Sequence, residues 1–134
     1  MKRSSFPGDP HTDIVLLNDK GPQLVIPTKI TTRERIVQVW AQQRILQDVF
    51  GSGKYLSILI SMSELQRDQD AGVNEICVPG QVGLFQKYLA QVSGMYYLDV
   101  PKAYGTEEIS QLVRVGDFGQ FLAGDLRKLL SGRL

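Results

Sequence analysis

Short apolar runs rich in β-branched and aromatic residues alternate along this chain with stretches whose apolar residues recur at helical spacing. The runs that favour strands lie at residues 13–17, 23–26, 55–60, 75–78 and 95–100. The stretches that favour helices lie at residues 31–50, 63–68, 81–92, 106–114 and 117–131. This alternation indicates one layered domain in which helices cover a sheet. We therefore predict an α+β fold with a mixed sheet of about four or five strands.

The first two runs predict a β-hairpin at the N-terminal side of the domain. Asn18-Asp19-Lys20-Gly21 supplies turn residues between the two runs. Pro22 and Pro27 bracket the second run, and a proline cannot donate to a strand ladder. We therefore expect this second strand near an edge of the sheet.

The length of the chain, 134 residues, is usual for a single domain. We place that domain at residues 13–134, after a flexible tail at residues 1–12 that contains proline, glycine and serine. The tail lacks the apolar segment of a signal peptide, and the most apolar window, 55–60, is too short to cross a bilayer. These features predict a cytoplasmic protein without a membrane partner.

The helix at 31–50 carries two separate sets of apolar residues. Thr31 and Glu34 have the spacing of a capping box at its start. Apolar residues before Gln43 lie on one side of the helix, and those after it lie mainly on the other. The second set comprises Ile45, Leu46, Val49 and Phe50. Because one core needs only one stripe, the helix should either break near Gln43 or contact a second body, and we assign this set to an interface with a second copy.

Side chains for nucleophilic or metal chemistry are scarce. His11 is the only histidine and lies in the expected tail, where nothing would hold it beside a nucleophile. Cys77 is the only cysteine and sits in an apolar run, which is typical of a buried side chain rather than a reactive thiol. We therefore expect no catalytic centre, no metal site and no cofactor.

A basic segment opens the helix at 31–50. Its candidate anion-binding residues are Lys29, Thr31, Thr32, Arg33 and Arg35. Free amides at a helix start favour an anion, so the segment predicts a contact with phosphate, on nucleic acid or on a small ligand. The chain as a whole has 15 basic and 14 acidic residues, so any attraction for nucleic acid depends on such a local patch.

The sequence-based interpretation is therefore a non-enzymatic interaction module that self-associates and acts as an adaptor, accessory or regulatory protein. The alternative is a nucleic-acid-associated regulator that uses the segment from Lys29 to Arg35. A third reading is a small enzyme with carboxylate chemistry at Glu64, Asp68 and Asp70.

Overall fold

The computed structural model of the chain describes residues 14–29, 36–67, 72–75 and 77–132. Its strands are β1 (Ile14–Leu16), β2 (Gln23–Ile26), β3 (Thr28–Lys29), β4 (Tyr55–Ser61), β5 (Leu65–Arg67), β6 (Val73–Glu75), β7 (Gly94–Tyr97) and β8 (Val115–Asp117). Its α-helices are α1 (Ile36–Phe50), α2 (Pro79–Tyr88), α3 (Glu107–Leu112), α4 (Phe118–Gln120) and α5 (Leu126–Leu130). A 3₁₀ turn, Lys102–Tyr104, precedes α3, and a π-helical segment, Phe121–Asp125, joins α4 to α5.

The predicted N-terminal hairpin is confirmed. Strands β1 and β2 pair antiparallel, with Ile14 opposite Ile26 and Leu16 opposite Leu24. Reciprocal hydrogen bonds close the turn: the Asn18 amide donates to Gln23 Oε1 at 2.9 Å, and Gln23 Nε2 donates to the Asn18 carbonyl at 2.7 Å. The Asn18 side chain also donates to the carbonyl of Leu130 at 2.8 Å, which fastens the turn to the end of α5.

Strand β4 is central in a six-stranded mixed sheet. The order is β1-β2-β4-β7-β8, and β3 continues the line of β2 along β4. Among the described strands of this sheet, only β1 and β2 pair antiparallel; β2, β3 and β7 pair parallel with β4, and β8 pairs parallel with β7. The α+β class and the mixed sheet are therefore confirmed, with more strands than expected.

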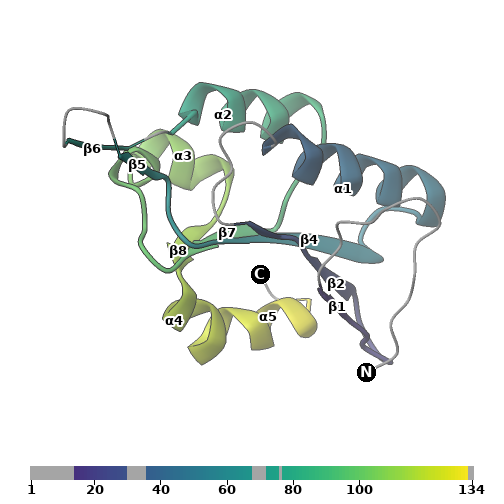
Figure 1. The fold of residues 1–134 in the computed structure, drawn as a ribbon. Helices are drawn as coiled ribbons and strands as arrows, with labels where there is room; N and C mark the ends of the chain where they lie inside the picture. The colour runs from purple at the N-terminus through teal and green to yellow at the C-terminus, as the bar shows by residue number, and fades with distance from the viewer. Residues whose placement is uncertain (1–13, 30–35, 68–71, 76, 133–134) are drawn as a thin grey trace.

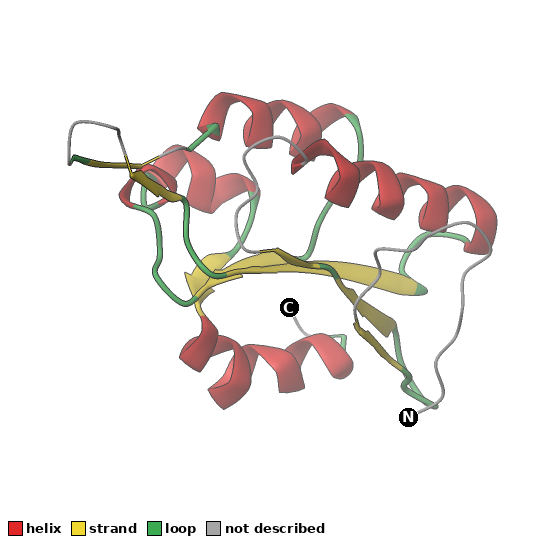
Figure 2. Cartoon of the chain, viewed as in Figure 1, coloured by secondary structure: helices red, strands yellow, loops and turns green. Residues whose placement is uncertain are grey.

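Helices cover both faces of this sheet. In Figure 1, α1, α2 and α3 lie on one face, and α4 and α5 lie on the other. Figure 2 shows the sheet between these two helical layers. Trp40, Val82 and Tyr97 belong to the core under α1–α3, whereas Tyr96 and Leu129 belong to the core over α4–α5. Successive residues of β7 thus serve opposite cores, as the alternation of a strand requires.

Helix α1 is continuous from Ile36 to Phe50, so the first of the two alternatives, a break near Gln43, does not occur. Its capping residues, Thr31 and Glu34, lie outside the described residues, as does the expected tail. The helix ends at Gly51, whose φ of 95° lies in the left-handed region that glycine tolerates.

The prediction of a helix at residues 63–68 is wrong. Residues Leu65–Arg67 instead form β5, which pairs antiparallel with β6 in a separate two-stranded ribbon. The strand expected at 75–78 is displaced to β6, and the helix expected at 81–92 is shorter and begins at Pro79. The short strand β8 was not expected, because its three residues include Gly116 and run directly into α4.

None of the described helices is both long enough and apolar enough to span a bilayer.

Candidate functional site

The parallel strands end together along one side of the sheet, which we call the carboxyl edge. Four residues form one register row there: Lys29, Ser61, Tyr97 and Asp117. In open sheets with parallel strands, ligands bind outside the carboxyl ends of the strands. This edge is therefore the first place to look for a functional site.

Lys29 provides the positive charge that the structure places on this row. The residue ends β3, and its side chain is partly buried. Its carbonyl accepts a hydrogen bond from the Met62 amide at 3.1 Å, which holds the backbone of Lys29 against the end of β4. Lys29 is the only member of the predicted basic segment among the described residues, because Thr31, Thr32, Arg33 and Arg35 lie outside them.

The N-terminal strand also starts on this side. Ile14 begins β1 opposite Ile26, at the end of β2 from which the chain runs on to β3 and Lys29. The first described residue is therefore at the same edge of the sheet as Lys29. Sequence reasoning could not reveal this relationship, because it depends on the register of the hairpin.

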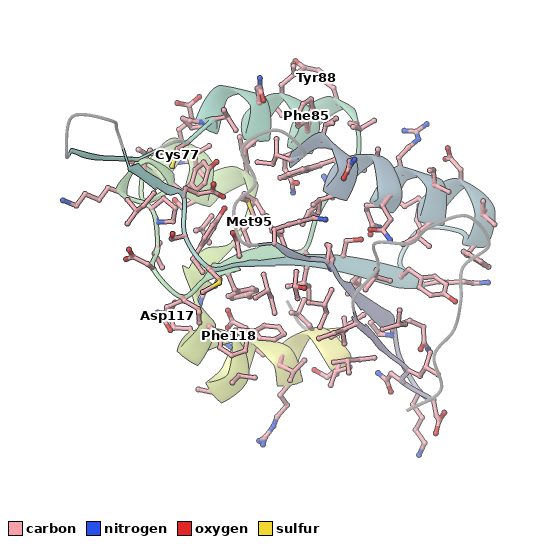
Figure 3. The ribbon with its side chains drawn as sticks, viewed as in Figure 1. Cys77, Phe85, Tyr88, Met95, Asp117 and Phe118 are labelled. Atoms are coloured by element: carbon pink, nitrogen blue, oxygen red, sulfur yellow. The ribbon has the colours of Figure 1, made fainter. Side chains whose placement is uncertain are left out.

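Acidic side chains lie at the carboxyl edge beyond β4, on the side away from Lys29. Asp117 is exposed and caps α4: its Oδ1 accepts from the Gln120 amide at 2.8 Å, and Gln120 Oε1 accepts from the Asp117 amide at 3.1 Å. Asp117 and Phe118 mark the passage from β8 into α4 (Figure 3). Asp99, two residues beyond β7, is also exposed. The edge is thus polarised, with Lys29 at one end and carboxylates at the other.

Glu64, a candidate for carboxylate chemistry, is buried. It follows β4, is 1% exposed, and its Oε1 accepts a hydrogen bond from the Tyr97 hydroxyl at 3.3 Å. Burial first, and then the neighbouring Tyr104 and Glu64, raise the pKa of Tyr97 far above its ordinary value. Glu64 therefore fastens the segment before the β5–β6 ribbon to the sheet; Asp68 and Asp70 lie outside the described residues.

A second buried carboxylate anchors the C-terminal helices. Asp125 is 3% exposed, and its Oδ2 accepts from the Tyr96 hydroxyl at 2.8 Å and from Arg114 Nε at 2.9 Å. Burial, then the hydrogen bond to Asp125, raises the pKa of Tyr96 well above its ordinary value. The same carboxylate raises the pKa of Arg114 through its hydrogen bond. This network fixes the π-helical segment beneath β7 and so sets the position of α4 at the carboxyl edge.

The predicted interface set on α1 divides between core and surface. Leu46 is 4% exposed and belongs to the monomer's own core. Ile45 and Val49 are 62% and 66% exposed, and Phe50 is partly exposed beside Tyr55. Helix α2 also presents an aromatic ring outward, since Tyr88 points away from the sheet (Figure 3).

Comparison with known proteins shows what the chain as a whole resembles. The chain matches the crystal structure of the type IIP restriction endonuclease Kpn2I with 47% sequence identity and a TM-score of 0.85. The chain is similar to a restriction endonuclease. The match covers 91% of this chain and 41% of Kpn2I, so the chain spans less than half the length of that enzyme.

The restriction endonuclease PspGI in complex with its substrate DNA also matches, at a TM-score of 0.53 and 12% identity over 82% of this chain and 41% of PspGI. That likeness concerns the fold alone. No protein-family model matches the chain, and no curated protein matches it either.

The likeness to Kpn2I corrects the functional interpretation made from the sequence. The interpretation as a non-enzymatic adaptor or regulatory module is contradicted, because 91% of this chain matches part of an enzyme. The regulator alternative and the expectation of no enzymatic role are contradicted for the same reason. That expectation weighed the scarcity of histidine too heavily, since carboxylate and lysine chemistry does not need one. The available signal was a lysine, Lys29, three residues after the apolar run that forms β2.

Nucleases often hold divalent metal ions between acidic side chains. Within the described ranges, no three His, Cys, Asp or Glu side chains gather closely enough to form such a site. The described residues alone do not complete a donor set for a metal ion, and we derive no step through one.

Proposed function

We propose that this chain binds double-stranded DNA along the carboxyl edge and contributes to phosphodiester cleavage there. The observation that carries the proposal is the 47% identity to Kpn2I over 91% of the chain. The polarised edge agrees with it, because a nucleic acid ligand needs cations for its phosphates. A cytoplasmic location belongs to the same proposal, since DNA is the ligand.

Lys29 is the side chain we assign to the scissile phosphate. Cleavage builds negative charge on the phosphate oxygens, and a fixed cation stabilises that charge more in the transition state than in the ground state. Asp13 precedes Ile14 in the sequence and is our candidate carboxylate partner, because β1 starts at the same edge as Lys29. Asp13 itself lies outside the described residues.

The predicted anion-binding segment supplies the phosphate contacts of the duplex. Lys29, Arg33 and Arg35 bring three cations within seven residues of sequence, against one acid, Glu34. We assign Thr31 and Thr32 to the same contact, through their hydroxyls. Such contacts release counterions. For each neutralised phosphate, the logarithm of the binding constant should therefore fall by about 0.9 for every tenfold rise in salt concentration.

The test is DNA binding by the full chain over a range of salt concentrations. We expect binding that weakens steeply with salt, and a slope smaller by about 2 in the double variant Arg33→Ala plus Arg35→Ala. The matched control removes two exposed lysines elsewhere, Lys54→Ala plus Lys87→Ala, and should leave the slope unchanged. Absent binding, or binding insensitive to salt, would overturn the proposal.

We also propose that copies of the chain associate through α1. Ile45, Val49 and Phe50 carry this proposal, because they are the predicted interface residues that remain at the surface. Leu46 contributes indirectly, by holding α1 on its own core.

A further inference from the structure

Two exposed apolar side chains lie in the row directly after Lys29. Met62 follows Ser61 at the end of β4, and Leu98 follows Tyr97 at the end of β7. Ser61 and Tyr97 are 1% and 0% exposed, whereas Met62 and Leu98 are 52% and 60% exposed. We call Met62 and Leu98 the apolar pair.

Backbone hydrogen bonds hold the apolar pair beside Lys29. The Met62 amide donates to the Lys29 carbonyl at 3.1 Å, and the Leu98 amide donates to the Ser61 carbonyl at 3.2 Å. The Asp99 amide donates to the Met62 carbonyl at 3.1 Å. Hydrogen bonds thus continue for one or two residues past the strand ends, so the backbones of Met62 and Leu98 stay next to each other and next to the end of β3. The exposed side chains of the pair therefore lie at the same edge as Lys29, within reach of a duplex bound there.

The charges on either side determine which part of a duplex can reach the pair. Lys29 attracts a phosphate on the β3 side, while the exposed carboxylate of Asp99 repels a phosphate on the β7 side. The backbone of the duplex should therefore follow Lys29, and its bases should face Met62 and Leu98. Apolar side chains at base edges contact the C5-methyl group of thymine, which lies in the major groove.

A protein partner fits this surface less well. Even with the exposed Leu65 and Val100, the pair offers only a small part of the roughly 800 Å² per partner that a stable protein interface buries. A contact with a thymine methyl group needs no more than one or two side chains.

We propose that Met62 and Leu98 contact base edges of bound DNA and favour thymine through its methyl group. This inference rests on the proposed function, because it requires a duplex at the carboxyl edge. It adds a base-reading role to a surface whose cations contact only the backbone.

The test compares two pools of short random duplexes that differ only in carrying thymine or uracil, which lacks the methyl group. The wild-type chain should bind the thymine pool about three- to tenfold more tightly, the effect of losing roughly one apolar contact. The double variant Met62→Ser plus Leu98→Ser should bind both pools equally, with the salt slope of the wild type. The control Leu17→Ser plus Leu84→Ser alters side chains of similar exposure, 56% and 53%, away from this edge and should keep the preference.

Each contrary result has a distinct meaning. Equal wild-type binding to both pools would overturn the inference and leave the proposed function standing, and this comparison needs no variant. A preference that survives in the Met62/Leu98 variant would overturn it as well. A variant that loses self-association while keeping its DNA preference would show a protein interface instead. A wild-type chain that binds neither pool would overturn both the inference and the proposed function.

Discussion

The Tyr96 hydroxyl donates a hydrogen bond of 2.8 Å to the buried carboxylate of Asp125, which joins strand β7 to the π-helical segment before α5. Arg114, the residue just before β8, completes the network: its Nε donates a hydrogen bond of 2.9 Å to the same Asp125 oxygen. A buried carboxylate with fewer donors loses part of its compensation for leaving water. The network therefore controls how firmly the C-terminal helices sit against the sheet.

Tyr96→Phe should lower the free energy of unfolding by about 1.5–3 kcal/mol, the usual worth of a hydrogen bond to a charged group. Urea denaturation of the wild type and the variant measures this change. Tyr88→Phe is the control, because Tyr88 is 78% exposed and should change stability little. An unchanged unfolding midpoint for Tyr96→Phe would show that Asp125 is satisfied by Arg114 alone.

Alkaline pH should destabilise the fold through Tyr96 and Tyr97. Burial raises the pKa of both hydroxyls in the folded chain, whereas in the unfolded chain they ionise near their ordinary value of 10.0. Their contribution to stability is therefore complete below pH 10 and is lost as pH rises above it, because only the unfolded chain then releases the protons. Tyrosinate absorbance recorded with unfolding should show these two residues ionising only as the chain unfolds. Ionisation of every tyrosine near pH 10 in a still-folded chain would contradict this.

Gln86→Leu should destabilise the chain by at least about 3 kcal/mol, since each buried polar group left without a partner costs about 1–3 kcal/mol. The Gln86 side chain accepts from Trp40 Nε1 at 2.8 Å and from the Val92 amide at 3.0 Å, and it donates to the carbonyls of Val92 and Leu112 at 3.1 Å each. Thermal unfolding measures the loss. Gln111→Leu changes an exposed glutamine on α3 and should shift stability by less than about 0.5 kcal/mol. Equal losses of stability from the two substitutions would contradict the stabilising role assigned to the Gln86 hydrogen bonds.

Ile45→Glu plus Val49→Glu should convert an associated chain to monomers without unfolding it, because both side chains are at the surface. Light scattering measures the mass, and circular dichroism checks the fold. Leu46→Glu provides the contrast: it places a charge in the core and should unfold the monomer. A wild-type chain that is monomeric at all concentrations would contradict the proposed association.

Local signals predicted much of this fold, whereas long-range pairing decided the rest. The hairpin followed from Asn18-Asp19-Lys20-Gly21 between two apolar runs, which is information contained within a few residues. The segment after Ser63 resembles a helix start, yet it forms β5 because β6 pairs with it, and such tertiary pairing overrides local propensity.

The candidate site was less accessible to sequence reasoning than the fold. Lys29, Ser61, Tyr97 and Asp117 come from four strands widely separated along the chain, and only parallel pairing aligns them. In the sequence, Lys29 stands out only for its charge and reads as part of a helix start, whereas in the structure it ends strand β3. The total charge hid the polarity of the edge, because 15 basic and 14 acidic residues nearly balance whatever their positions in the fold.

Cleavage of supercoiled plasmid DNA by the full chain, in buffer containing Mg²⁺, tests the central claim most directly. Lys29→Ala is compared with Lys54→Ala. Lys54 is an exposed lysine just before the amino end of β4, at the opposite end of the parallel strands from Lys29. The account predicts strand cleavage by the wild type and by Lys54→Ala, and at least about a hundredfold slower cleavage by Lys29→Ala, as expected when a group that stabilises transition-state charge is removed. No cleavage by the wild type, or equal cleavage by all three proteins, would contradict it.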